Sequence, residues 1–167
     1  MIKYLQTKRN RGLRMINKKV RVYQTPLERA NTSYDTEVHK EIIHQEKNFY
    51  NVLFDNIQVG KVIERRFLIK KDDCPIAFIK SFIPCIHSNI KSNECVNLEK
   101  EVDDLLQVKI VKKEFSLTWP TNEEAEILHI IGDGQIIVEK QYLLNRENKI
   151  IRYEEESSSP EIFIFEE

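Results

Sequence analysis

The amino-acid sequence predicts an α+β domain with a mainly antiparallel β-sheet and helices packed on one side of it. Residues 61–84 and residues 130–157 each contain two β-rich runs joined by a short polar turn, which is the pattern of a β-hairpin. Only short amphipathic segments with helical spacing lie between the strand-like segments. Strands that follow one another through hairpins pair in antiparallel fashion, and the helices then form a second layer on the sheet.

Length and composition indicate one soluble domain with a single core. The chain has 167 residues, of which 41% are hydrophobic and 32% are charged, and this balance is ordinary for a globular protein. No apolar run approaches the roughly 20 residues that span a bilayer, and the first residues lack the apolar segment of a secretory signal. We therefore expect a cytoplasmic protein that does not contact a membrane.

The cysteine, histidine and acidic residues predict neither a cofactor nor a metal site. Cys74, Cys85 and Cys95 form an odd set without a C-x-x-C pair, so we expect reduced thiols. The histidines are scattered, and we expect no site role for them. Acidic residues occur on predicted helices and turns, at Asp103, Asp104, Glu123, Glu124 and Glu154 to Glu156. Charge runs of this kind are usually solvated.

Residues 1–35 combine basic charge with turn-forming residues, and we expect a basic arm or linker ahead of one domain that spans residues 36–167. The basic residues at the start occur without an intervening acid: Lys3, Lys8, Arg9, Arg11, Arg14, Lys18, Lys19 and Arg21. A helix-turn-helix needs two amphipathic helices joined by a tight turn, and this segment has no such pattern. We therefore expect no sequence-specific contact between this chain and DNA.

A strand, a helix and a hairpin are predicted for the first half of the domain. Residues 37–45 alternate loosely between polar and apolar side chains, which favours a strand. Residues 48–56 carry apolar side chains at roughly helical spacing, which favours a short helix. The hairpin over residues 61–84 is expected to turn at residues 72–75, where two aspartates and a proline occur.

The second half begins with a helix over residues 98–108, whose leucines and valine share one face. A strand follows over residues 108–119. Thr121 and Glu124 have the spacing of a capping box, which predicts the start of another short helix.

The chain closes with the hairpin over residues 130–157 and a short alternating strand within residues 157–167. The loop of this hairpin is expected at residues 145–148. Gly132 and Gly134 flank an aspartate, but no parallel strand precedes them and no helix follows, so they predict a turn and no nucleotide site.

This order of elements resembles the UTRA domain, the effector-binding domain of HutC-branch GntR transcriptional regulators, which shares the chorismate lyase fold. The similarity covers about residues 35 to 167 and is most specific in TNEEAEILHIIGDGQIIVE, residues 121–139. There a helix that begins at a threonine and carries paired acids is followed by a strand with glycine and apolar residues. The resemblance implies a non-enzymatic, homodimeric sensor domain of a bacterial regulator. The winged helix that usually precedes this domain is not recognisable, so we expect an effect on DNA only through a regulator partner.

The resemblance also implies a pocket for a small anionic metabolite such as a sugar phosphate. Its candidate ligand-binding residues are Arg65, Arg66, Lys80, Ser116, Tyr153 and Glu155. A fixed guanidinium or ammonium group suits such a ligand because charge-assisted hydrogen bonds give both energy and orientation. Arg65 and Arg66 are adjacent on a predicted strand, so only one of them can face the pocket.

Three alternatives stay open from the sequence. The candidate cations could be solvated surface charges, and the hydroxyl and acidic side chains could form ordinary cross-strand pairs. The domain could be vestigial and bind no ligand, since family members that bind sugar phosphates commonly carry two arginines one residue apart rather than an adjacent pair. The shared fold also allows an enzyme of the chorismate-pyruvate lyase type, although no set of arginines and an acid suited to that chemistry is recognisable.

Overall fold

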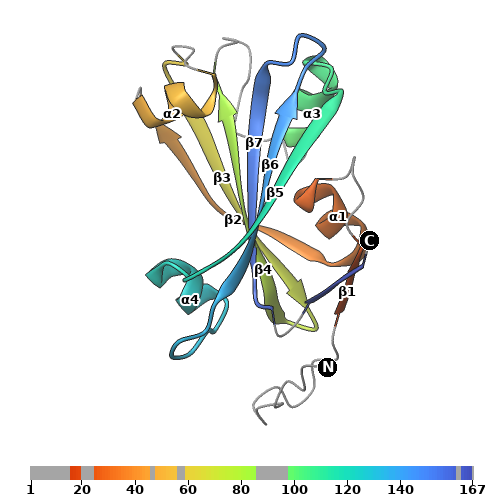
Figure 1. Ribbon diagram of the computed structural model, residues 1–167, viewed down its shortest axis with the longest axis vertical. Helices are drawn as coiled ribbons and strands as arrows, with labels where there is room; N and C mark the ends of the chain where they lie inside the picture. The colour runs from red at the N-terminus through yellow and green to blue at the C-terminus, as the bar shows by residue number, and fades with distance from the viewer. Residues whose placement is uncertain are drawn as a thin grey trace.

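The computed structural model describes residues 16–19, 25–45, 48–55, 59–85, 98–160 and 163–166. Most of the described strands form one six-stranded sheet (Figure 1). In the order of their pairing, its strands are β2 (Asp35–His44), β3 (Val62–Lys71), β4 (Cys74–Pro84), β7 (Ile150–Ser158), β6 (Ile136–Leu144) and β5 (Ile110–Thr118). Every neighbouring pair in this sheet is antiparallel, which confirms the predicted fold class. The two predicted hairpins are present as β3–β4 and β6–β7.

The helices cover both faces of the sheet. Those in the described residues are α1 (Pro26–Ser33), α2 (Asn48–Leu53), α3 (Leu98–Leu105) and α4 (Asn122–Ile127). None of these helices is long and apolar enough to cross a membrane. Figure 1 shows α2 and α4 on one side of the sheet and α1 and α3 on the other, which we call the α2–α4 face and the α1–α3 face. The prediction that all helices pack on one side was therefore wrong.

The physical reason lies in the central strands, which are apolar on both sides. Phe78 and Ile79 are neighbours on β4 and point to opposite faces, yet both are completely buried. Ile79 packs with Leu27 of α1, whereas Phe78 packs with Leu128 at the end of α4. A strand that is apolar on both faces needs a covering layer on each.

The same division holds one strand further along the sheet. On β3, Ile63 packs with Leu98 of α3, and its neighbour Val62 packs with Tyr50 of α2. Among the described residues, no helix covers the α2–α4 face between the α2 and α4 clusters. This gap in the apolar cover is where the charged side chains of that face lie.

Helix α1 lies in a segment where the sequence predicted only turns. Thr25 and Glu28 form a capping box there, with Pro26 in the first turn, and this is the signal that correctly predicted α4. Leu27 and Ala30 of α1 are buried in the core. The helix falls inside residues 1–35, the expected arm or linker, as does β1 (Ile16–Lys19), which pairs in parallel with β8 (Phe163–Glu166). Residues 1–15 and 20–24 lie outside the described residues, and the boundary at residue 35 stays a prediction.

Replacing Thr25 with alanine is expected to lower the free energy of unfolding by about 1 kcal/mol. The Thr25 hydroxyl accepts a hydrogen bond from the Glu28 amide at 3.2 Å, and the side chain is buried, so its loss leaves a helix donor unpaired. Urea unfolding of Thr25→Ala and Thr25→Ser measures the effect. Serine keeps the hydroxyl and should retain most of the stability, and an equal loss in both variants would show that the cap does not stabilise α1.

Candidate functional site

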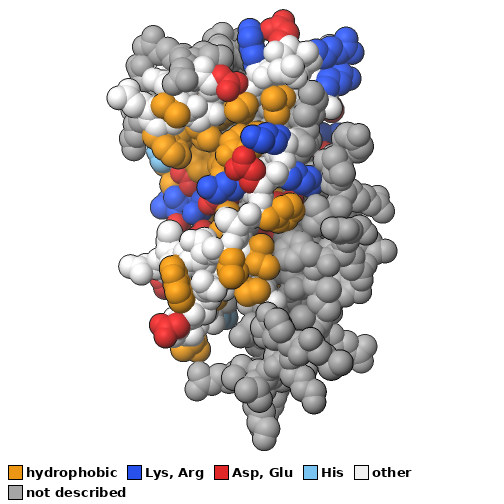
Figure 2. Space-filling view, viewed as in Figure 1, with side chains coloured by type: hydrophobic (Ala, Val, Ile, Leu, Met, Phe, Trp, Pro, Cys, Tyr) orange, Lys and Arg blue, Asp and Glu red, His pale blue; other side chains and the backbone are white. Residues whose placement is uncertain are grey.

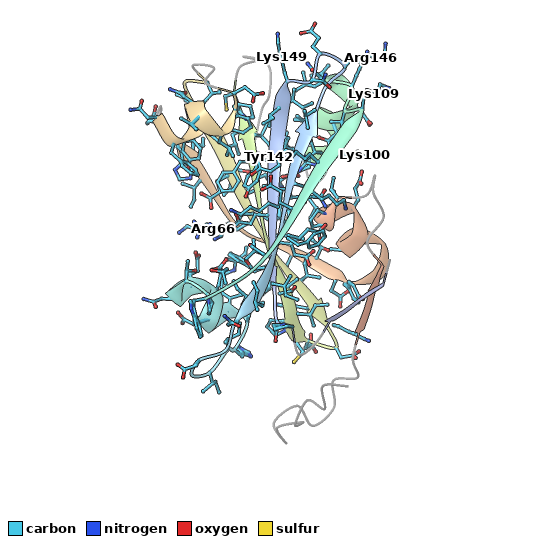
Figure 3. All side chains as sticks on the ribbon, in the orientation of Figure 1. Arg66, Lys100, Lys109, Tyr142, Arg146 and Lys149 are labelled. Atoms are coloured by element: carbon cyan, nitrogen blue, oxygen red, sulfur yellow. The ribbon has the colours of Figure 1, made fainter. Side chains whose placement is uncertain are left out.

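Three of the predicted site residues stand in one row across the α2–α4 face. Arg66 on β3 is directly opposite Lys80 on β4, and Lys80 is directly opposite Glu155 on β7. Lys140 on β6 continues the row beside Glu155. We call these four residues the charged row. Figure 3 shows Arg66 projecting into the space between α2 and α4.

Arg66 is held by carboxylates from two elements. Its Nε donates to Glu64 at 2.6 Å, and its Nη1 donates to Glu123 of α4. His44 bonds to the other oxygen of Glu64 at 2.5 Å, so this histidine has a defined partner that the sequence did not predict. Burial alone would raise the pKa of Glu64, but the hydrogen bonds from Arg66 and His44 outweigh it and hold the pKa below its usual value.

Lys80 is held more loosely than Arg66. Its Nζ lies 3.5 Å from Glu124, a residue whose carboxylate also accepts hydrogen bonds from Thr121 and from Ser157. The Lys80 ammonium also lies 5.6 Å from the centre of the Phe78 ring. It therefore keeps donor capacity for another acceptor.

Two further predicted residues, Tyr153 and Ser116, lie at different distances from the charged row. Tyr153 follows the same side of β7, and its hydroxyl donates to Glu155 at 2.7 Å. Ser116 lies on β5 and is exposed. Four strand intervals separate Ser116 from Arg66, which is a distance of roughly 19 Å. The structure thus brings together Arg66, Lys80, Tyr153 and Glu155 and leaves Ser116 apart.

Arg65 points to the α1–α3 face, as its adjacency to Arg66 predicted that one of the pair must. It joins a second group of charges there, whose members are Arg65, Ser81, Glu99, Asp103, Arg152 and Glu154, and we call this group the buried network. Arg65 Nη1 donates to Glu99 of α3 at 2.7 Å. Both Arg65 and Glu99 are only 4% exposed.

Arg152 is the centre of the buried network. Its Nε and Nη2 donate to the two oxygens of Asp103 on α3 at 2.8 and 2.7 Å, which is a bidentate pair. Its Nη1 reaches Glu154 at 3.2 Å and the Ser81 hydroxyl at 3.3 Å. Arg152 is 1% exposed and Glu154 is fully buried. The strand β7 therefore carries Arg152 and Glu154 on this face, and Tyr153 and Glu155 on the other.

Burial is the largest influence on the pKa values of two acids in the buried network, Glu99 and Glu154. It raises the pKa of Glu154 to about 7, against the opposing effect of the Arg152 guanidinium. Burial also raises the pKa of Glu99, although Arg65 opposes the shift. The second oxygen of Glu154 accepts a hydrogen bond from the Leu27 amide at the start of α1, at 2.9 Å. Glu154 thus connects α1 to the arginine that holds α3.

The expectation that the acidic runs are solvated was wrong for three of the seven acids, which are buried. Glu124, Glu154 and Glu156 are each less than 5% exposed, and Asp103 and Glu123 pair with arginines. A signal was present in the sequence: residues 152, 154, 156 and 158 are polar at a spacing of two, which places them on one face of a strand. The spacing alone does not tell whether that face is exposed to solvent or packed against other elements. Here α1 and α3 cover it.

Comparison with known proteins bears on the fold. No family model and no curated protein sequence matches the chain. Among solved structures, the effector domain of PhnF from Mycobacterium smegmatis superposes with a TM-score of 0.72 at 9% identity, over 90% of this chain and 97% of that chain. The chain has the fold of a GntR-regulator effector domain. This confirms the predicted UTRA-like fold.

Other solved structures of GntR-type regulators also superpose on this chain. A GntR-family regulator from Enterococcus faecalis gives a TM-score of 0.67 at 14% identity, over 80% of this chain and 99% of that chain. The C-terminal domain of the histidine utilization repressor from Pseudomonas syringae gives 0.69 at 7% identity, over 79% and 95%. With a second structure of PhnF from Mycobacterium smegmatis, the match covers 91% of this chain and 70% of that chain. Identities this low make the likeness one of fold alone.

Proposed function

We propose that this chain is a non-enzymatic sensor domain of a bacterial GntR-type transcriptional regulator, acting in the cytoplasm as a homodimer. Its ligand is a small anionic metabolite such as a sugar phosphate, and it acts on DNA only through a regulator partner. The observation that carries the proposal is the direct pairing of Arg66 with Lys80 on a partly open part of the α2–α4 face. Each of these two side chains is 16% exposed, so solvent reaches both.

Arg66 and Lys80 suit an anion because both keep hydrogen-bond donors. The contacts of Arg66 use Nε and Nη1, and its Nη2 has no partner among the described residues. The Lys80 ammonium has one distant carboxylate partner. Directly opposite residues on neighbouring antiparallel strands have Cβ atoms about 5 Å apart, so one phosphate or carboxylate could bind both groups.

Ligand binding would replace a bond within the protein. The Glu123 side chain is 38% exposed and can leave Arg66 without a large loss of burial. An anion that takes its place would release one attachment of α4 to the sheet, and Tyr153 and Glu155 on the neighbouring strand could accept or donate hydrogen bonds to sugar hydroxyls. A ligand that binds more tightly when α4 is released from Arg66 than when α4 is attached would increase the population of the released position.

Thermal unfolding against a panel of sugar phosphates, small carboxylates and inorganic phosphate tests the proposal. A ligand of the native state at a hundredfold excess over its dissociation constant stabilises the protein by about 2.7 kcal/mol. We expect Arg66→Ala to lose the rise in melting temperature. Lys70→Ala should keep it, because Lys70 is a cation on the same strand whose partner is the exposed Glu37.

Three outcomes would overturn the proposed site. If no compound stabilises the native chain, or if Arg66→Ala responds equally, the anion does not bind at the charged row. A hit that is lost in Arg65→Ala but kept in Arg66→Ala would place the ligand in the buried network instead. A panel without any hit would favour a vestigial domain.

A further inference from the structure

The charged row continues beyond the pair of Arg66 and Lys80 to a second cation. Lys140 of β6 stands directly opposite Glu155 of β7, and Glu155 stands directly opposite Lys80 of β4. One carboxylate therefore lies between two lysines on neighbouring strands. Figure 2, in the same orientation as Figure 3, shows basic and acidic side chains between two groups of hydrophobic side chains.

Lys140 has no acid partner in the part of the chain that the structure describes. Glu155 and Glu114 stand opposite it on the two neighbouring strands, but neither forms an ion pair with Lys140. Glu114 pairs with Lys112 at 3.2 Å, and Glu155 accepts a hydrogen bond from the Tyr153 hydroxyl at 2.7 Å. Lys140 is half-buried, and its ammonium group carries three donors that a ligand could use.

Glu155 keeps acceptor capacity in the middle of the row. A carboxylate has about four lone-pair sites, and the hydrogen bond from Tyr153 uses one of them. Glu155 is half-buried, so its remaining sites suit a ligand hydroxyl, whereas its charge repels an anion. From Arg66 to Lys140 the row thus matches a sequence of anion, hydroxyl and anion.

We propose that the ligand carries an anionic group at each end and hydroxyl groups between them, and that Lys140 binds the second anion. The first anion binds Arg66 and Lys80, and a hydroxyl between the two anions donates a hydrogen bond to Glu155. This inference rests on the proposed function, because it assigns the far end of the ligand at the same site.

The spacing of the strands sets the length of this ligand. Lys80 and Lys140 are two strand intervals apart, which places their Cα atoms roughly 10 Å from each other. An extended chain gains about 3.5 Å for every three covalent bonds, so two phosphorus atoms separated by about nine bonds lie roughly 10 Å apart. A six-carbon sugar with a phosphate at each end has this separation. The flexible lysine side chains accommodate small differences in length.

The residues on either side of the row confine a charged ligand to it. One step toward α2, the rings of Phe82, Tyr153 and Tyr142 stack in order across three strands. One step toward α4, Phe78 and Val138 pack with the end of that helix. An anion placed off the row would lose water against these rings and aliphatic groups without gaining a cation. Among the described residues no helix lies over the row itself, so an elongated molecule has access to it.

Calorimetric titration of the full chain tests the second anion site. The ligands are fructose with a phosphate at each end, fructose with a phosphate at one end, and inorganic phosphate. We expect the native chain to bind the doubly phosphorylated sugar about tenfold or more tightly than the singly phosphorylated one. In Lys140→Gln the two sugars should bind with similar affinity, and the affinity for the singly phosphorylated sugar should stay as in the native chain.

Lys112→Gln is the matched control. Lys112 is a lysine on the same face, one strand beyond Lys140 and one step off the row, and its partner is Glu114. This variant should keep the preference for the doubly phosphorylated sugar. Equal affinity of the native chain for the two sugars, or a preference that Lys140→Gln retains, would overturn the inference. So would a preference that Lys112→Gln loses to the same extent as Lys140→Gln.

The titrations separate this inference from the proposed function. If the two sugars bind equally and Arg66→Ala weakens both, the first anion site stands and the second anion site is wrong. If none of the three ligands binds the native chain, both the anion site at Arg66 and its extension to Lys140 are wrong.

Discussion

Replacement of Arg152 by alanine is expected to lower the free energy of unfolding by about 3 to 5 kcal/mol. The arginine is 1% exposed and holds Asp103 by two hydrogen bonds and Glu154 by one. Its removal leaves the fully buried Glu154 without its cation and releases the two hydrogen bonds by which Asp103 attaches α3 to the sheet. The loss comes from the charge left behind as much as from the bonds removed.

Urea unfolding at pH 7 measures this effect, with Arg146→Ala as the control. Arg146 lies in the exposed β6–β7 loop, and its replacement should change stability by less than about 0.5 kcal/mol. A triple variant, Arg152→Met with Asp103→Leu and Glu154→Met, should recover much of the loss because the three charges are removed together and none of them is left without its partner. If Arg152→Ala costs no more than Arg146→Ala, the buried network does not contribute to stability.

The elements that sequence reasoning found are those specified by local signals. Hairpins with polar turns and the capping box at Thr121 depend on residues close together in the chain, and both are present in the structure. The capping box at Thr25 has the same signal, and α1 was missed because the surrounding polar residues favoured a turn. The uninterrupted apolar run at residues 76–79 indicates burial on both faces, and it could have predicted helices on both.

The sequence did not predict which acidic residues pair with the arginines. That Arg65 and Arg66 face opposite ways follows from strand geometry, and the structure has them so. Which acids they meet depends on where α3 and α4 pack, and Glu99 and Glu123 lie 34 and 57 residues away in the chain. The row of Arg66, Lys80 and Glu155 also needed the register of two strand pairs, including an irregularity at Ile69 and Lys70.

Because of Glu154, the protein is expected to be more stable in mildly acidic solution than at neutral pH. Its pKa is about 7 in the folded chain and near 4.5 without the shift, so between these values the folded state keeps a proton that the unfolded chain has released. Stability therefore falls as the pH rises from about 4.5 to 7, by roughly 3 kcal/mol from this group. Burial raises the pKa of Glu99, which acts in the same sense. Glu64 and Glu124 have lowered pKa values, so their stabilisation is lost only as the pH falls through the acid range.

Glu154→Gln isolates the contribution of this carboxyl group. Urea unfolding of the native chain and of the variant at pH 5 and pH 7.5 should show a larger decline in the native chain, because glutamine has no proton to lose. Glu147→Gln is the control, since Glu147 is exposed in the β6–β7 loop and should leave the native pH dependence unchanged. Parallel declines in the native chain and in Glu154→Gln would show that Glu154 ionises normally in the fold. Glu154 accepts a hydrogen bond from the Leu27 amide of α1, so hydrogen exchange at that amide gives a second readout. In Glu154→Gln, the exchange rate should rise with pH only in proportion to the hydroxide concentration. In the native chain, the rate should depart from this proportionality over the pH range in which the Glu154 carboxyl group ionises.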